Sequence, residues 1–188
     1  LISGGGFLPT DNLSNIISTN SQKTVLILMF FLSITNFYLI FNFFNRRVLL
    51  KSHKEDMYLF ALIIILTLLI LFNDLDIFNL TISILSALAN SGLTLIRSDN
   101  NLGLYFLFIT IVGGSLVSNT SGIKLARLYI LIKITSSEII KLISPNSIIN
   151  RTIFNSDLKI NDDNIKISFL IFISFFLSLF ILSSLLVI

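Results

Sequence analysis

The sequence predicts an all-α integral membrane protein, and three observations lead to this fold class. Hydrophobic residues make up 54% of the 188 residues and charged residues only 12%, whereas roughly a quarter of a soluble domain is charged. Several uncharged runs approach the roughly 20 apolar residues that a helix needs to cross a bilayer. The charged residues cluster between these runs rather than within them. A chain of this composition is expected to fold as helices in lipid.

Three apolar segments predict complete membrane-spanning helices. They cover residues 25–44, 57–72 and 167–188. The second segment is the shortest of the three, and residues on either side of it can extend the span. None of the three carries a charge, as expected of helices that face hydrocarbon.

Two further segments are too irregular to be simple spans. Residues 77–96 carry no charge, but their asparagine, serine and threonine side chains make them too polar for a lipid-facing helix. We expect a short helix followed by an extended turn with glycine, which is a re-entrant pore segment. Residues 102–133 are apolar at both ends and are broken at 113–122 by glycines and polar residues. Such backbone is tolerated at membrane depth only where it lines a watery cavity or is buried in protein.

The basic residues predict which side of the membrane each loop occupies. We place residues 1–24 and 73–101 on one side, and residues 45–56 and 124–166 on the other. The first side then carries two of the 13 lysines and arginines, and the second side carries the other eleven. The positive-inside rule makes the second side cytoplasmic. This topology requires residues 77–96 to enter and leave on the same outer face.

Two glycine-bearing turns on the predicted outer side indicate an internal repeat. "ISGGGFLPTD" at 2–11 and "LANSGLTLIRSD" at 88–99 each end in an acidic residue that precedes an inward-going helix. The repeat length is roughly 85 to 90 residues. Backbone carbonyls in such turns can replace the water shell of a cation, and glycine permits the φ/ψ values that this requires. The alternative is that these small residues serve close helix packing.

The composition argues against several other classes of protein. The chain has no cysteine, which excludes disulfides and thiolate sites, and its single histidine, His53, lies in the polar segment "KSHKED". No predicted span carries a pair of ionisable side chains that could act as acid, base or metal ligand, so a membrane-embedded enzyme is disfavoured. Asp157, Asp162 and Asp163 lack the spacing and terminal glutamate of a calcium loop. The net charge of +3 is explained by topology and gives no reason to expect a nucleic-acid partner.

Taken in order, these segments resemble the Trk/Ktr family of bacterial potassium transporters. "ISGGGFLPTDNLS", "ILMFFLSITNF" and "KSHKEDMYLFALIII" resemble the family's second filter and the helices after it, and "SILSALANSGLTL" resembles its third filter. "IVGGSLVSNTSGIKLARLYILIK" resembles the family's glycine-rich break, which is the most specific of these motifs. "KLISPNSII" resembles the segment that leads toward the last repeat. The resemblance covers essentially the whole chain.

The resemblance implies an architecture of repeated helix–re-entrant pore loop–helix units around one permeation path. Residues 1–56 would end the second repeat, residues 57–145 would form the third, and residues 146–188 would be a cytoplasmic linker and the first helix of the fourth. The chain is then expected to be part of a longer, multi-pass protein of the bacterial cytoplasmic membrane. It would pass K⁺, with Na⁺ as the other candidate ion, and use no enzymatic or covalent cofactor. The resemblance also implies a homodimer and a cytoplasmic nucleotide-binding regulatory subunit.

Matching the family's motifs by position assigns two groups of site residues. The selectivity filter is assigned to Ser3, Gly4, Gly5, Gly6, Asn90, Ser91, Gly92 and Leu93. The intramembrane gating loop is assigned to Gly113, Gly114, Ser115, Ser118, Asn119, Thr120, Ser121, Gly122 and Lys124. The loop has fewer glycines than the family pattern, and Asn90-Ser91 stands where threonines are commoner.

Other interpretations stay open at the level of sequence. The break at 113–122 is alternatively an ordinary kink, since glycine and serine pairs kink helices. Lys124, one helical turn before Arg127, is either an anchor that snorkels to the membrane surface or a residue that sets the electrostatics of the gate or contacts a cytoplasmic regulator. The whole chain is alternatively a structural subunit of another membrane complex, or a non-conducting divergent paralogue.

Overall fold

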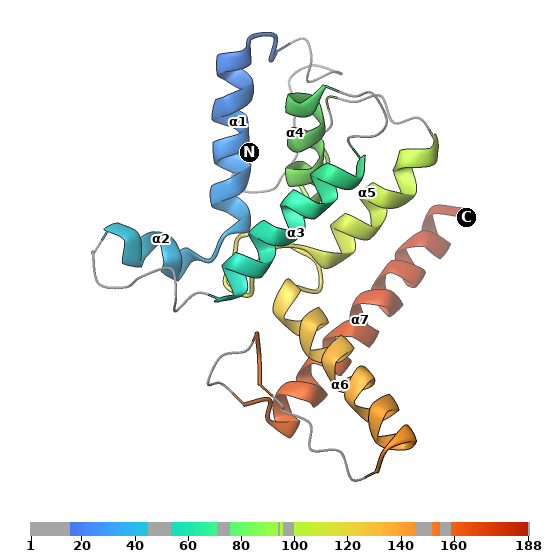
Figure 1. Cartoon of the computed structure of the whole chain (residues 1–188). Coiled ribbons are helices and arrows are strands. Elements are labelled where there is room, and N and C mark those ends of the chain that lie inside the picture. The colour runs from blue at the N-terminus through green and yellow to red at the C-terminus, as the bar shows by residue number, and fades with distance from the viewer. Residues whose placement is uncertain are drawn as a thin grey trace. The chain divides into compact units, whose positions relative to one another are not determined.

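The computed structural model describes residues 16–44, 54–70, 76–93, 95, 100–145, 152–154 and 159–187. Regular structure in these residues is helical, apart from one isolated bridge between Thr152 and Lys159, and the all-α prediction is confirmed. The helices are α1 (Asn20–Ile34), α2 (Phe37–Phe44), α3 (Lys54–Ile70), α4 (Ile77–Leu88), α5 (Asn100–Val112), α6 (Leu125–Ile143) and α7 (Asp162–Val187) (Figure 1). They belong to two compact units, residues 1–124 and residues 125–188.

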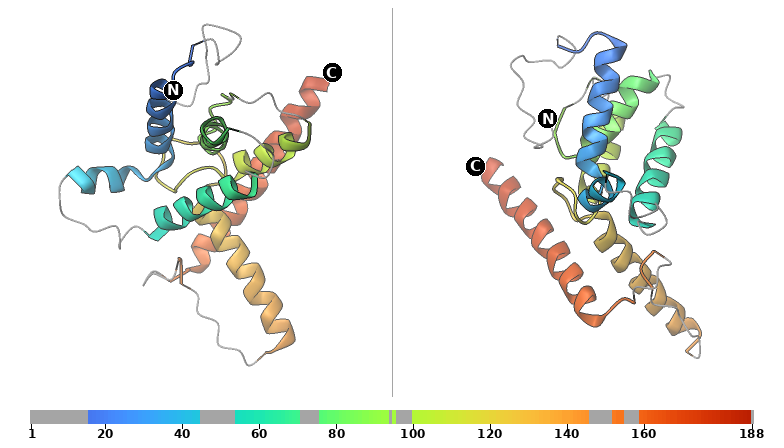
Figure 2. Two further views of the ribbon diagram at one scale, coloured as in Figure 1. Left: turned by 45° about the horizontal axis from the view of Figure 1, so that its top comes forward. Right: turned by 90° about the vertical axis from the view of Figure 1, so that its left-hand side faces the viewer.

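In the first unit, α4 is the central helix. It packs against α1, α3 and α5, and the left view of Figure 2 shows it nearly end-on with these three around it. Leu80 and all residues from Ile82 to Leu88 are buried. A helix that is apolar or small all round is expected in the interior of a protein. The prediction of a short helix followed by a turn within residues 77–96 is therefore confirmed for the described residues.

The predicted single span at 25–44 is wrong, because the helix breaks at Thr35 and Asn36. Helix α1 begins with a capping box at Thr19 and Gln22 and ends at Ile34, after which Thr35 takes an extended conformation with ψ of 158°. The chain then turns sharply into α2 (Figure 1). Asn36 stabilises the start of α2, because its Oδ1 accepts the backbone N–H of Tyr38 at 2.9 Å.

Helix α3 begins with acidic residues and continues as an apolar helix. Glu55 and Asp56 lie in its first turn, where negative charge interacts favourably with the helix dipole. Further along, Leu59 is buried, and the ring of Phe60 stacks on that of Phe31 in α1 with centroids 4.9 Å apart. These contacts fix the start of α3 beside the end of α1. The predicted helix at 57–72 is present over the residues that the structure describes.

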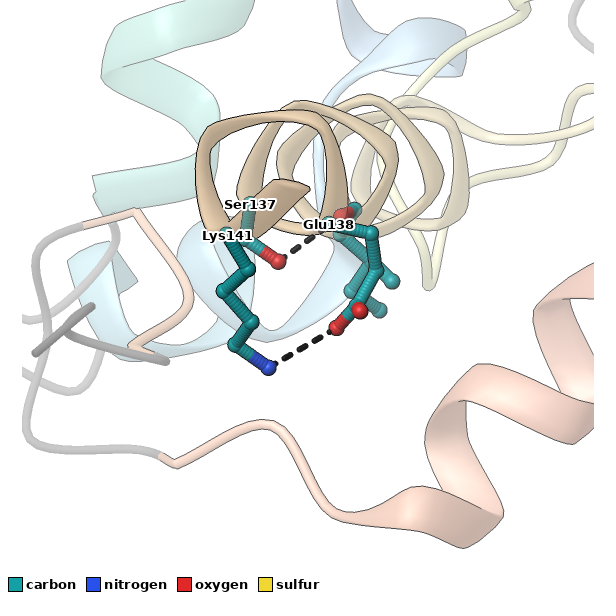
Figure 3. A network of polar contacts seen from close by, with 4 residues as sticks. Ser137, Glu138 and Lys141 are labelled. Atoms are coloured by element: carbon teal, nitrogen blue, oxygen red, sulfur yellow. Dashed lines mark hydrogen bonds and ion pairs between the residues drawn. The ribbon is translucent and has the colours of Figure 1, made fainter. Parts of the chain in front are cut away.

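In the second unit, α6 packs against α7. A short segment after α6 contacts it, since Phe154 stacks on Tyr129 at 4.3 Å and Lys133 Nζ donates to the carbonyl of Thr152 at 2.5 Å. On the exposed side of α6, Glu138 and Lys141 form an ion pair at 3.0 Å (Figure 3). Helix α7 begins at Asp162, earlier than the predicted start at 167, and it takes Asp162 and Asp163 into its first turn.

One helix of the described residues is both long and apolar enough to cross a membrane by itself. It is α7, over the 25 residues Asp162–Leu186. Helices α1 and α4 and the segment Leu102–Val112 of α5 are apolar but shorter. The predicted break in the segment 102–133 is confirmed, because α5 ends at Val112 and α6 begins at Leu125.

Candidate functional site: a glycine turn and a broken helix

The turn after α4 has an unusual backbone that small polar residues hold in place. Asn90 and Gly92 have positive φ values of 54° and 71°, a conformation that glycine adopts readily and asparagine tolerates. The hydroxyl of Ser86 lies 2.8 Å from that of Ser91 and accepts the N–H of Leu93 at 3.0 Å. The N–H of Ser91 donates to the carbonyl of Ser86 at 3.1 Å. These hydrogen bonds hold the turn against the end of α4.

The turn presents one residue outward between two buried ones. Ser91 and Leu93 are buried, whereas Gly92 is exposed. A Cβ added at Gly92 would meet nothing within 4 Å. Open space at a glycine with positive φ means that backbone conformation, and not crowding, favours glycine there. Asn90 Nδ2 is buried without a hydrogen-bond partner among the described residues.

The segment between α5 and α6 is a loop with a narrow neck. Gly113 and Gly122 have φ of +68° and +90°, and a Cβ at Gly122 would lie 3.2 Å from the Cα of Gly113. A Cβ at Gly113 would lie 2.5 Å from the carbonyl oxygen of Ser121. The N–H of Ile123 donates to the carbonyl of Ile111 at 3.1 Å and closes the neck. Both glycines are therefore required by close backbone approach as well as by φ.

This loop docks on the break between α1 and α2 through the backbone. The N–H groups of Ser115 and Asn119 donate to the carbonyls of Ile34 at 3.1 Å and Ser33 at 3.2 Å, respectively. In return, the N–H of Phe37 donates to the carbonyl of Val117 at 2.9 Å. The last carbonyls and first N–H groups of a helix have no partner inside it. Each broken segment thus supplies the partners that the other one lacks.

Two carboxylates at the start of α3 hold both breaks. Glu55 Oε1 accepts the N–H of Leu116 at 2.6 Å, and Asp56 Oδ1 accepts the N–H of Asn36 at 3.1 Å. Asp56 is only 1% exposed. The sequence alone predicts no role for either residue. The available signal was a pair of acidic residues at the edge of an apolar run, where a buried carboxylate needs donors from elsewhere in the fold.

Lys124 ends the loop in a strained conformation with its ammonium group turned back into it. Its φ is +75°, which costs a residue with a side chain about 1–2 kcal/mol. Lys124 Nζ lies 3.1 Å from the carbonyl oxygen and 3.2 Å from the hydroxyl oxygen of Ser118. It also donates to the carbonyl of Thr120 and lies 3.1 Å from the hydroxyl of that residue. The side chain therefore points back into the loop.

An open cavity of about 700 Å³ lies between the α1–α2 break and residues 116–119 of the loop. Its polar lining includes Ser33 and Asn119. The hydroxyl oxygens of Ser33 and Ser115 are buried without partners among the described residues. The described residues include no group of three or more histidine, cysteine or acidic side chains that could hold a metal ion.

The predicted site residues fall into three sets. Asn90–Leu93 form the turn after α4, and Gly113–Lys124 form one loop, both within the first unit. Ser3, Gly4, Gly5 and Gly6 lie outside the described residues. The division into repeats at residues 56 and 145 stays a prediction.

Comparison with known proteins supports the resemblance at the level of the fold. No protein-family model matches the chain, and no curated protein matches its sequence. Among solved structures, the fold is similar to the crystal structure of the potassium transporter TrkH from Vibrio parahaemolyticus, with a TM-score of 0.75 and 18% sequence identity. The alignment covers 96% of this chain and 42% of that one. This chain therefore has a Trk-like fold and spans about two fifths of the length of the transporter that it matches.

Proposed function

We propose that this chain is part of the pore-forming subunit of a transporter that moves K⁺ across a membrane. Ions would pass the turn Asn90–Leu93 as a selectivity filter and then the loop Gly113–Lys124 as a gate. The observation that carries the proposal is helix α4, which is buried and uncharged. Its carboxyl end leads directly into a turn in which Gly92 is exposed. The likeness to a potassium transporter over 96% of the chain supports the same function.

The physics of a K⁺ filter fits the turn. The carboxyl end of a helix carries a partial negative charge, and α4 ends at Leu88, directly before the turn. Neutral carbonyl oxygens can replace the water shell of K⁺ without a carboxylate. Successive side chains of an extended strand point in opposite directions. Asn90 and Gly92 have positive φ values, so the backbone of the turn differs from that of an extended strand. The hydroxyls of Ser86 and Ser91 hold this conformation by hydrogen bonds.

The loop has properties suited to a gate. Hydrogen bonds from the ends of α1, α2 and α3 hold residues 115–119, and these bonds join segments far apart in sequence. Each such bond contributes only about 0.5–1.5 kcal/mol to stability. The free energy of binding an ion or a partner is therefore enough to rearrange the loop. We propose in addition a multi-pass topology in a bacterial cytoplasmic membrane, a homodimer and a cytoplasmic nucleotide-binding regulatory subunit. The charge asymmetry of the loops supports the topology.

Rubidium uptake tests the proposal. The full-length protein and its Gly92→Asp variant are expressed in cells that lack their own K⁺ uptake systems, and the amount of each protein in the membrane is measured. We expect uptake by the unaltered protein and at least a tenfold loss in Gly92→Asp, because a carboxylate at an exposed filter residue would bind the ion too strongly to release it. Equal uptake by both proteins would contradict the filter assignment. Uptake no higher than in cells with an empty vector would contradict transport.

A further inference from the structure

We propose that the turn Ser118–Thr120 is a binding site for a monovalent cation, and that the ammonium group of Lys124 occupies it as a tethered ion. The site consists of the carbonyl and hydroxyl oxygens of Ser118 and Thr120, which we call the oxygen cage. All four of these oxygens contact Lys124 Nζ. The role of the cage in gating rests on the proposed transport function, whereas its ability to bind a cation does not.

The oxygens around Lys124 Nζ are of the kind that also coordinates a monovalent cation. An ammonium group has three N–H donors, but four cage oxygens converge on Lys124 Nζ. Three of them lie at 3.1–3.2 Å. All four are neutral, and neutral carbonyl and hydroxyl oxygens suit a large monovalent ion that loses its water easily. The chemical class of the ligand is therefore a K⁺-sized cation.

The cage is built by contacts that do not depend on Lys124. The hydroxyl of Thr120 accepts the N–H of Gly114 at 3.0 Å. The hydroxyl of Ser118 donates to the carbonyl of Ser115 at 2.7 Å and lies 2.8 Å from that of Thr120. A Cβ at Gly114 would approach both hydroxyl oxygens to 2.8 Å, so a glycine leaves room for them. The oxygens would thus keep their positions when the lysine is removed.

The backbone conformation of Lys124 indicates that its contacts with the cage outweigh the local backbone strain. A positive φ is sterically unfavourable for lysine, and such strain persists only where surrounding contacts determine it. The contacts that do so include the four to the cage. Since one cage cannot hold two cations, a permeating ion reaches it only when the ammonium group leaves. We therefore assign the lysine-filled cage to the closed loop.

The variant Lys124→Gly tests the cage with little risk to the backbone, because glycine adopts φ of +75° without strain. Lys124→Asn, a neutral residue that also tolerates this conformation, is the second variant. Thermal unfolding of the purified full-length proteins is followed in KCl and in choline chloride at equal ionic strength. We expect K⁺ to raise the Tm of both variants by several degrees more than that of the unaltered protein, because a cation that binds only the folded state stabilises it.

A charge-matched control separates the cage from a general effect of charge. Lys141→Ala removes one positive charge from an exposed ion pair with Glu138 on α6 (Figure 3), and we expect its response to K⁺ to equal that of the unaltered protein. Adding Thr120→Val to Lys124→Gly removes one cage oxygen and should abolish the extra response.

An equal K⁺ response in Lys124→Gly, Lys124→Asn and the unaltered protein would overturn the proposal, as would an equal gain in Lys141→Ala. The outcome is independent of rubidium uptake. A cage that binds K⁺ in a protein without uptake would contradict only the transport function. Uptake that depends on Gly92, together with no K⁺ response in the Lys124 variants, would contradict only the cage.

Discussion

Residues with positive φ lie at two of the places where the described part of the first unit departs from helix. Asn90 and Gly92 follow α4, and Gly113, Gly122 and Lys124 lie in the loop after α5. Backbone strain of this kind is common at functional sites, where surrounding contacts maintain it. The glycines could be predicted from sequence because glycine is the usual residue at such positions. The conformation of Lys124 could not, because it depends on oxygens that only the folded loop brings together.

Substitution of the neck glycine tests whether the loop needs its present conformation. Gly113→Ala combines positive φ with a Cβ that would lie 2.5 Å from a backbone oxygen, and we expect a cost of about 1–3 kcal/mol. The control is Gly103→Ala in α5, where an added Cβ meets nothing within 4 Å and alanine should gain about 0.5–1 kcal/mol. Thermal unfolding in detergent measures both changes, and each kcal/mol corresponds to a shift in Tm of about 2–4 °C. Equal Tm values for the two variants would contradict the tight neck.

The elements of the first unit depend on one another at their ends. The carbonyls of Ser33 and Ile34 in α1 accept hydrogen bonds from the loop, and the carbonyl of Val117 in the loop accepts one from the start of α2. The two carboxylates of α3 accept one hydrogen bond from each break. Two interrupted helices would each be costly alone because their end groups lack partners. Placed side by side, they satisfy one another. A change at one break is therefore expected to reach the other.

Asp56 is the residue at which this dependence is most easily tested. Asp56→Ala leaves the N–H of Asn36 without its acceptor at a position where Asp56 is 1% exposed, and the expected cost is about 1–3 kcal/mol. Glu138→Ala, which breaks an exposed ion pair on α6, should cost less than about 1 kcal/mol. The two variants are compared by thermal unfolding under the same conditions. A smaller loss in Asp56→Ala than in Glu138→Ala would contradict a structural role for this carboxylate.

The same elements indicate how far sequence could predict the fold. The break at 113–122 was predicted because its glycines and hydroxyl residues lie together in the sequence. The break at Thr35 and Asn36 is not predicted, because only Ser33, Thr35 and Asn36 mark it within an uncharged run. Its stabilisation comes from Asp56 and Val117, 20 and 80 residues beyond the groups that they contact. Partners at such distances are determined by the tertiary fold and leave no local pattern.

At the scale of the whole molecule, the short helices are consistent with a path for ions. Within the described residues, α7 alone is both long and apolar enough for a complete span, while α1, α4 and α5 are 15, 12 and 13 residues long. Interrupted helices are tolerated at membrane depth where they line a cavity or are buried in protein. The Trk-like fold is shared, at 18% identity, with the structure of a potassium transporter.

Topology is the property on which the transport proposal depends most. Residues 77–96 must enter and leave on the outer face, so that α4 and its turn reach into the membrane without crossing it. The chain has no cysteine, and single cysteines introduced by Asp76→Cys, Asn100→Cys, Lys54→Cys and Lys159→Cys would report the position of each loop. A maleimide that cannot cross membranes should label the first two in intact cells and the last two only after lysis, because the loops that carry eleven of the 13 basic residues are expected inside. If positions 76 and 100 were labelled from opposite sides, residues 77–96 would cross the membrane. The turn Asn90–Leu93 could not then be a filter entered from outside.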